Sequence, residues 1–201
     1  MGALLHPAGR FAGAWAAVPA AVVDRMRAGG SWRDDPRCPG FDQLAFVEVD
    51  HRTLDGGVAR GELVVAREVA AATVRLFGRL FALGFPLRAM RLIDDHGADD
   101  ARSMAADNSS AFCFRTVDGS DALSWHARGM AIDLNPVENP WVRGDRFVPA
   151  EGAPFLDRAT IRPGMIVRPG PVTRLFDDEG WEWGGDWRHS SDYHHIVWAR
   201  R

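Results

Sequence analysis

The sequence predicts an α+β domain in which helices from the N-terminal half pack on a small antiparallel sheet. Apolar residues recur at helical spacing between positions 62 and 83, whereas Trp, Gly, Pro, Asn and Asp dominate the second half, where only short apolar stretches occur. Helices and short strands that occupy separate parts of a chain are typical of α+β folds. With 201 residues and 46% hydrophobic content, the chain can bury one sizeable core.

The N-terminal part is predicted to be an extension joined to the main domain by a loop. Residues 1–30 are rich in Ala and Gly, and we expect a helical extension there with an amphipathic helix over 12–26. The following stretch, "AGGSWRDDPRCPGFDQL", contains the Gly and Pro residues that punctuate loops. We therefore expect residues 31–201 to form a single domain.

The main domain is predicted to begin with a strand, a turn and a long helix. "LAFVEVDHRTLDGG" combines an apolar run with turn residues. The helix is expected over 62–83, because apolar side chains recur there with a period near 3.6 and Gly84 and Pro86 supply a stop signal. Those apolar positions are Val65, Val69, Val74, Phe77, Leu80 and Phe81. Three later stretches, "PLRAMRLID", "GMAIDL" and "HIVWA", are predicted strands.

Composition excludes several classes of function. The net charge of −3 gives no electrostatic reason to bind nucleic acid or an anionic membrane surface. All 24 basic residues are Arg, so Schiff-base chemistry on lysine and a P-loop lysine are both excluded. No apolar run approaches the roughly 20 residues that span a bilayer. The N-terminus is a poor secretory signal, because Arg10 and two prolines interrupt its apolar region, so localisation stays open.

Two cysteines, Cys38 and Cys113, are too few for a cysteine-based zinc site or a disulfide framework. They are compatible with one bridge or with two buried thiols, and both alternatives stay open.

The stretch "SWHARGMAIDLNP" brings an imidazole and a carboxylate together. On a strand over 130–134, Asp133 shares a face with the small Ala131, which leaves space beside its carboxylate. A turn at Gly129 can fold His126 back toward that space. One imidazole and one carboxylate are two of the three protein ligands of a catalytic zinc ion. The alternative is a buried Asp–His hydrogen bond without a metal.

The C-terminal stretch "HSSDYHHIVWARR" contains two adjacent histidines, His194 and His195. On a strand they point to opposite faces, so they cannot both serve one site. Asp192 precedes the strand and is expected in its approach loop. A loop carboxylate beside a metal suits a general base that acts on metal-activated water. The alternative is a surface loop of mixed polarity.

These two stretches carry a family resemblance. "SWHARGMAID" fits S-x-H-x-x-G-x-A-x-D, "DYHHI" fits a later D-x-x-H, and "WEWGGDW" lies between them. Over about 38–198 the chain resembles the VanY-like zinc peptidases, the family of D-alanyl-D-alanine carboxypeptidases and L-alanyl-D-glutamate peptidases. The resemblance implies that His126, Asp133 and His195 are zinc ligands. It also implies that Asp192 is the catalytic base and that Arg115 steadies the substrate carbonyl or the tetrahedral intermediate.

The resemblance implies a zinc-dependent hydrolase that cleaves an amide bond in peptidoglycan stem peptides or related short peptides containing D-amino acids. The small antiparallel sheet would then carry the metal site. The family spacing selects His195 as the ligand, with His194 packing or hydrogen-bonding on the opposite face. Candidate substrate-binding residues are Ser124, Trp183 and Tyr193, although a local hydrogen bond is the simpler role for Ser124.

Two other functions compete with the peptidase. A non-catalytic wall-binding or regulatory module would keep the fold but lose ligands or base, and all four residues are present here. A domain without a catalytic metal would use the same His and Asp side chains only to satisfy one another. The sequence does not identify the scissile bond, and it does not distinguish cleavage inside a peptide from cleavage at its end. Export also stays open. We expect a monomer.

Overall fold

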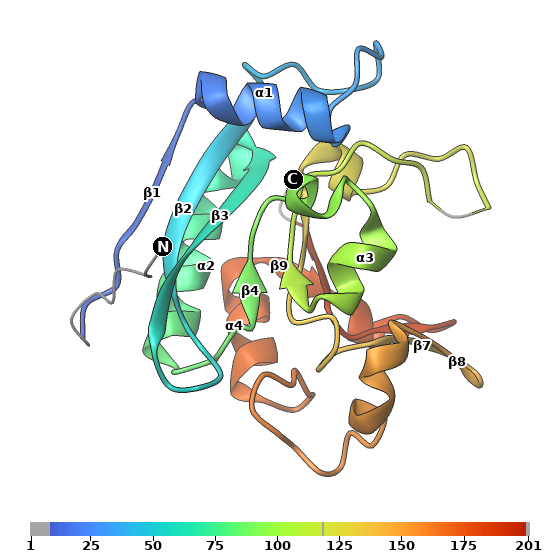
Figure 1. Cartoon of the computed structure of the whole chain (residues 1–201). Helices are drawn as coiled ribbons and strands as arrows, with labels where there is room; N and C mark the ends of the chain where they lie inside the picture. The colour runs from blue at the N-terminus through green and yellow to red at the C-terminus, as the bar shows by residue number, and fades with distance from the viewer. Residues whose placement is uncertain (1–8, 118, 200–201) are drawn as a thin grey trace.

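The computed structural model describes residues 9–117 and 119–199 (Figure 1). It contains helices and small, mostly antiparallel sheets, so the predicted mixture of both is confirmed. The four α-helices are α1 (Ala20–Gly29), α2 (Ala70–Ala82), α3 (Asp100–Ala105) and α4 (Pro171–Glu179). Short 3-10 helices are η1 (Arg67–Val69), η2 (Ile93–His96), η3 (His126–Arg128), η4 (Ala150–Phe155) and η5 (Gly184–Asp186).

Within the described residues, the strands form four small sheets. The first is antiparallel, in the order β1 (Gly13–Ala16), β2 (Leu44–Arg52), β3 (Val58–Ala66). A second antiparallel sheet has the order β6 (Ala131–Asp133), β11 (His195–Trp198), β9 (Trp181–Trp183). A third has the order β10 (Ser191–Asp192), β7 (Trp141–Arg143), β8 (Arg146–Val148). The last is a parallel pair of β4 (Ala89–Met90) and β5 (Asn108–Ser109).

The long helix predicted over 62–83 is wrong at its N-terminal end. Residues 62–66 belong to β3, which pairs with β2 along its whole length, and the α-helix begins only at Ala70. In "GELVVA" the apolar run suits a strand as well as a helix, and pairing with β2 decides in favour of the strand. The structure keeps the predicted C-terminal end within one residue, because α2 ends at Ala82.

The predicted N-terminal extension over 1–30 falls partly outside the described residues. In the described part, the helix begins at Ala20 rather than near residue 12, after Pro19 in an extended conformation. Residues 13–16 form β1, which pairs with β2 from Gly13 opposite Val49 onward. This part of the chain therefore contributes an edge strand to the first sheet.

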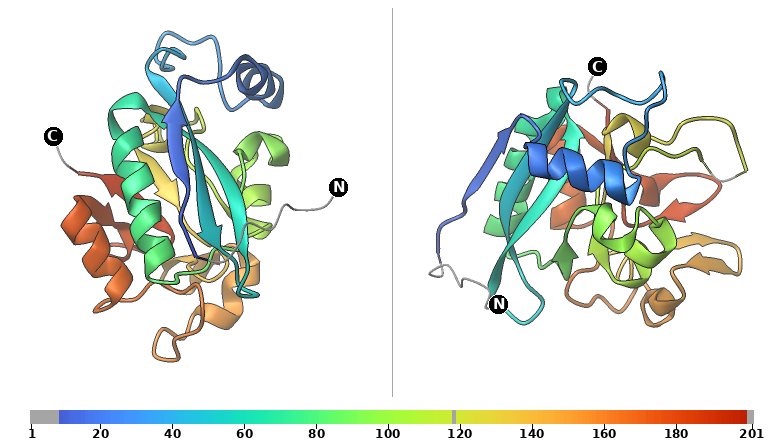
Figure 2. Two further views of the ribbon diagram at one scale, coloured as in Figure 1. Left: turned by 90° about the vertical axis from the view of Figure 1, so that its left-hand side faces the viewer. Right: turned by 45° about the horizontal axis from the view of Figure 1, so that its top comes forward.

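The first sheet is apolar on both faces, and each face is covered by a different helix (Figure 2). Successive strand residues point to opposite faces, so Val47 and Val65 lie in the cluster with α2, whereas Phe46 and Val64 lie in the cluster with α1. From α1, Val22 and Met26 enter that second cluster.

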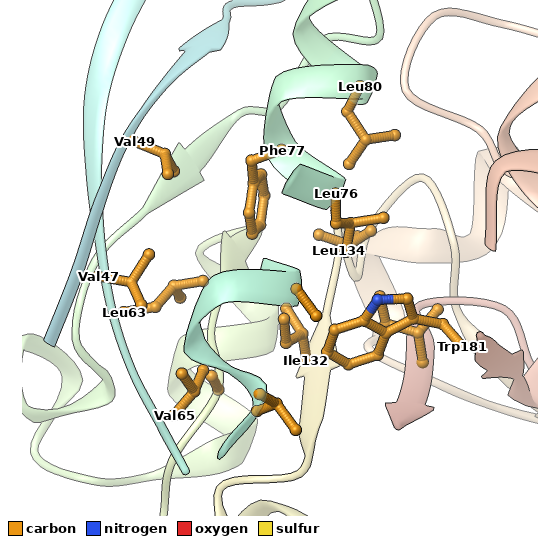
Figure 3. Close-up of a cluster of buried hydrophobic side chains, with 14 of the residues drawn as sticks. Val47, Val49, Leu63, Val65, Leu76, Phe77, Leu80, Ile132, Leu134 and Trp181 are labelled. Carbon is orange, nitrogen blue, oxygen red and sulfur yellow. The ribbon is translucent and has the colours of Figure 1, made fainter. Parts of the chain in front are cut away.

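The main core connects the first sheet to the sheet of β6, β11 and β9. Figure 3 shows Leu76, Phe77 and Leu80 of α2 among side chains from both regions. The partners drawn there are Val47, Val49, Leu63 and Val65 from the first sheet and Ile132, Leu134 and Trp181 from the second region. Because these side chains are almost fully buried, they fix β6 relative to the rest of the protein.

A buried carboxylate cluster holds the loop after β6. The carboxyl group of Glu138 is buried beside Asp107, and Arg88 lies 3.3 Å from Asp107 and 3.4 Å from Glu138. Asp107 also accepts a hydrogen bond from the backbone nitrogen of Val137. Burial, with the hydrogen bond and negative charge of Asp107, raises the pKa of Glu138 to about 8.

The raised pKa of Glu138 predicts that the free energy of unfolding falls as the pH rises. Between the usual carboxyl pKa near 4.5 and about 8, the folded protein keeps a proton on Glu138 that the unfolded chain releases. The stabilisation is therefore complete below about 4.5 and is lost as the pH rises through 8. We expect the Tm of the wild type to fall by at least about 2–4 °C more than that of Glu138→Gln between pH 5 and pH 9. Parallel Tm–pH curves would contradict this assignment.

Candidate metal centre

The three candidate ligands come from neighbouring elements. Asp133 is the last residue of β6, and His195 is the first residue of β11 directly opposite it in the antiparallel register. On its other side, Asp133 exchanges two backbone hydrogen bonds with Ser110, of 2.8 and 3.1 Å. His126 opens η3, immediately before β6. The backbone therefore holds all three residues close together.

Gly129 is the turn that returns the chain from His126 to β6. Its φ of 69° lies in the left-handed region, and its oxygen accepts a hydrogen bond from the backbone nitrogen of Ala66. A Cβ atom on Gly129 would collide with that same nitrogen. The glycine in the H-x-x-G pattern is thus required for both its backbone conformation and its close contact with β3.

Gly129→Ala is expected to lower the free energy of unfolding by at least about 2 kcal/mol, because strain at positive φ adds to the collision with Ala66. Gly144→Ala is the matched control, since Gly144 has a φ of 58° but an open surrounding. It is expected to cost only about 1 kcal/mol. Urea unfolding of both variants measures the difference. Equal losses would show that the contact with Ala66 has no energetic weight.

The ligand atoms of the candidate site converge on one point. Nε2 of His126 lies 3.1 Å from Oδ2 of Asp133 and 3.2 Å from Nδ1 of His195. Nδ1 of His195 lies 3.0 Å from Oδ1 of Asp133. Nitrogen and oxygen ligands about 2.0–2.1 Å from a tetrahedral zinc ion lie about 3.3–3.4 Å apart. The three groups therefore fit zinc with only a small expansion.

The imidazole of His126 is prepared for metal binding. Its Nδ1 lies 2.6 Å from the carbonyl oxygen of Ala111. Because a carbonyl only accepts, Nδ1 carries the hydrogen, and Nε2 can present its lone pair to the site. A ligating histidine usually donates its other N–H in this way. His195 approaches the other two groups with Nδ1, and its Nε2 is buried and has no hydrogen-bond partner among the described residues.

Without a metal, the charges of the site compensate one another. Burial alone would raise the pKa of Asp133, but the imidazoles of His126 and His194 hold it well below its usual value. Burial alone would lower the pKa of His126, and Asp133 raises it above its usual value. A fully buried carboxylate surrounded by imidazoles is a favourable position for a divalent cation.

The site opens into a cleft with a volume of about 990 Å³. The predicted residues His126, Asp133, His195, Arg115, Ser124 and Asp192 all line it. The remaining lining residues are Asp100, Met104, Val117, Trp125, Trp141, Arg143, Asp145, Arg146, Phe147, Val148, Trp187 and His194. The cleft is large enough to receive a short peptide.

Arg115 reaches the cleft from the segment that runs beside β3. Its guanidinium pairs with Asp100 of α3 at 2.9 Å, and its Nε atom is buried without a hydrogen-bond partner among the described residues. The backbone oxygen of Arg115 accepts a hydrogen bond from Ser124, two residues before His126. Arg115 is therefore tied to the segment that carries the first ligand.

Strand alternation predicts that His194 lies on the face opposite to His195, but the structure does not place it there. β11 begins at His195, so the alternation does not extend to His194. His194 lines the same cleft, with Nε2 2.9 Å from Oδ1 of Asp192 and 4.0 Å from Oδ1 of Asp133. Although burial opposes it, the negative charges of Asp192 and Asp133 raise the pKa of His194 to about 10.

The three candidate substrate-binding residues have different positions. Ser124 is in the cleft but is buried, and its hydroxyl accepts a hydrogen bond from the backbone nitrogen of His126. Trp183 is buried in the main core and donates to the carbonyl oxygen of Tyr193. Tyr193 packs against that core, with the guanidinium of Arg158 4.5 Å from its ring centroid. Neither of these two aromatic residues lines the cleft.

Sequence reasoning missed the aromatic rim of the cleft. Trp125 and Trp187 are 48% and 42% exposed, and the ring of Trp187 lies 5.3 Å from that of His195. Trp187 is the third Trp of "WEWGGDW", so that stretch contains the residue that lines the cleft, whereas the predicted Trp183 lies in the core. The hairpin of β7 and β8, with Arg143 opposite Arg146, lines the cleft and has no sequence signature.

Both cysteines are free thiols. Cys113 is buried and Cys38 is partly buried. Of the two alternatives left open by the sequence, the structure contains the unbridged one, although Cys38 is less buried than expected.

Comparisons with known proteins extend these observations. Residues 118–198 match the family model described as D-alanyl-D-alanine carboxypeptidase. The matched segment contains all three candidate ligands and Asp192, so the family resemblance drawn from the motifs is confirmed over residues 118–198. The earlier part of the predicted resemblance, with Arg115, lies outside the match. No curated protein and no solved structure is significantly similar to the chain. Among the helices of the described residues, none has the length and apolar character needed to cross a membrane.

Proposed function

We propose that the chain is a zinc peptidase, because residues 118–198 match the family model described as D-alanyl-D-alanine carboxypeptidase. Its substrates would be peptidoglycan stem peptides or related short peptides that contain D-amino acids. The observation that carries the proposal is the convergence of Nε2 of His126 and Nδ1 of His195 on the carboxylate of Asp133, with contacts of 3.0–3.2 Å, in a cleft of peptide size.

The donor set fits zinc. Two imidazoles and one carboxylate are the ligands of a catalytic zinc site in which a fourth position stays open. When bound, zinc would supply Lewis acidity, which makes water a nucleophile near neutral pH and polarises the substrate carbonyl. The hydrogen bond from Nδ1 of His126 to the carbonyl oxygen of Ala111 supports metal binding through Nε2 of His126. The imidazole ring already has the orientation that this binding requires.

The proton transfers are assigned to Asp192. Its side chain lines the same cleft as the candidate ligands but belongs to β10 rather than to the ligand set. A carboxylate at this position accepts a proton from the attacking water and returns it to the amine that leaves. Hydrolysis then proceeds without a covalent enzyme intermediate. Ser124 is not needed as a nucleophile, which agrees with its hydrogen bond to the backbone.

Arg115 is assigned to the negative charge that develops on the carbonyl oxygen. Asp100 pairs with one terminal nitrogen of its guanidinium at 2.9 Å, and the side chain is partly exposed to the cleft. A preorganised guanidinium in a partly buried site stabilises an oxyanion more strongly than water does. The ion pair with Asp100 supports this role because it limits the movement of the arginine.

The test is incubation of the zinc-loaded protein with defined muropeptides and identification of the products by mass. Loss of one terminal D-alanine would indicate a carboxypeptidase, and cleavage between L-alanine and D-glutamate would indicate an endopeptidase. If the protein binds these peptides but leaves them intact while zinc is bound, the non-catalytic alternative replaces the peptidase. If it neither binds nor cleaves them, the substrate class is wrong.

A further inference from the structure

We propose that His194 is a positioning residue that holds the carboxylate of Asp192 in its working orientation. This inference rests on the proposed function of the site. It concerns a side chain to which neither the family motifs nor the ligand set gives a role. The inference stands on three features of the structure, namely the anchoring of His194, its contact with Asp192 and its separation from the ligands.

The first feature is the anchoring of the imidazole. Nδ1 of His194 lies 2.8 Å from the backbone oxygen of Asn139, to which it must donate. Asn139 is fully buried, and its side chain makes five hydrogen bonds of its own. The ring of His194 is therefore hydrogen-bonded to a residue whose own position is fixed by several hydrogen bonds.

The second feature is the contact with Asp192. With Nδ1 occupied by Asn139, Nε2 of His194 lies 2.9 Å from Oδ1 of Asp192, at ion-pair distance. That buried oxygen has no hydrogen bond of regular geometry among the described residues, so His194 is its nearest polar side chain. Within residues 9–117 and 119–199, no other side chain is recorded within ion-pair distance of this carboxylate. A carboxylate at the end of a two-residue strand has rotational freedom that this contact removes.

The third feature is the separation from the ligand set. Nε2 of His194 is 4.0 Å from Asp133, whereas His126 and His195 approach the same carboxylate to 3.1 and 3.0 Å. Both ring nitrogens of His194 already face other partners. A role for His194 as a fourth ligand would require Nε2 to give up its contact with Asp192, so we assign the side chain to Asp192 instead.

Two substitutions separate the contacts of His194. In His194→Gln the side-chain amide lies near the position of Nε2 and can donate to Asp192. In His194→Asn it lies near the position of Nδ1 and can donate only to Asn139. We expect the Gln variant to keep activity within about threefold of the wild type. The Asn variant should lose about 10–100-fold in kcat, with little change in KM or zinc content.

A double-mutant cycle tests whether His194 acts through Asp192. If it does, His194→Asn should slow the wild type about 10–100-fold but should have almost no further effect on Asp192→Asn. A multiplicative loss, or equal activities of the Gln and Asn variants, would overturn the positioning role. Loss of zinc from His194→Asn would overturn it as well, because His194 would then act on the ligands.

A spectroscopic measurement distinguishes this proposal from the function on which it rests. In the metal-free wild type, the Nε2 proton of His194 should give a strongly downfield NMR signal that disappears in Asp192→Asn. If the wild type cleaves no peptide but keeps this signal, the proposed function fails and the His194–Asp192 contact stands. If the signal is absent from an active wild type, the positioning proposal fails by itself.

Discussion

Replacement of His126 by Ala is expected to remove zinc from the protein and to lower kcat/KM by at least about 10³-fold. The Nε2 atom of His126 is one of the converging candidate ligand atoms, 3.1 Å from Oδ2 of Asp133 and 3.2 Å from Nδ1 of His195. With one of only three protein ligands lost, the two that are left cannot hold zinc in a tetrahedral site with an open position. The measurement is zinc per chain by elemental analysis after dialysis, together with the rate of muropeptide cleavage.

His189→Ala is the matched control for this substitution. His189 is exposed and does not line the cleft, so zinc content and rate should equal those of the wild type. Because His126 is buried, its loss also leaves the carbonyl of Ala111 without this partner, and circular dichroism must establish that the variant is folded. About one zinc per chain in folded His126→Ala would contradict the ligand assignment.

Asp192→Asn is expected to separate metal binding from catalysis. Asn keeps the shape of the side chain but cannot accept a proton, and Asp192 is outside the group of residues whose ligand atoms converge. Zinc content should therefore equal that of the wild type, whereas kcat should fall about 10²–10⁴-fold. Single-turnover cleavage of a muropeptide, measured beside the zinc content, provides both values.

The control for this second prediction is Asp24→Asn. Asp24 is exposed on α1 and is not among the residues that line the cleft, so its variant should retain full activity and zinc. Undiminished turnover of Asp192→Asn would remove the general-base role. Loss of zinc from that variant would instead move Asp192 into the ligand set.

The sequence was sufficient to find the candidate ligands because their spacing is local. His126, Gly129 and Asp133 lie within eight positions of the chain, and the chemistry of a metal site requires these residue types. Asp133 and His195 are far apart in sequence, but each belongs to a predicted short strand, and the two strands pair. The orientation of His194 was not predictable in this way, because it depends on where β11 begins and on Asn139.

The error in the predicted helix has a different cause. The apolar residues of "GELVVA" fit the period of a helix as well as that of a strand. The strand forms because the segment pairs with β2, where Leu44 lies opposite Ala66. Such pairing between segments separated in sequence is not visible in the local pattern. The same holds for the β7–β8 hairpin and for Trp187, since their positions over the site depend on the whole fold.

X-ray absorption at the zinc edge of the loaded protein tests the central claim most directly. The account predicts one zinc per chain with nitrogen and oxygen ligands at about 2.0–2.2 Å, two of them imidazoles. It also predicts that Asp133→Ala and His195→Ala each remove this signal. A sulfur shell near about 2.3 Å, or an unchanged spectrum in both variants, would contradict the convergence of His126, Asp133 and His195 on one metal ion.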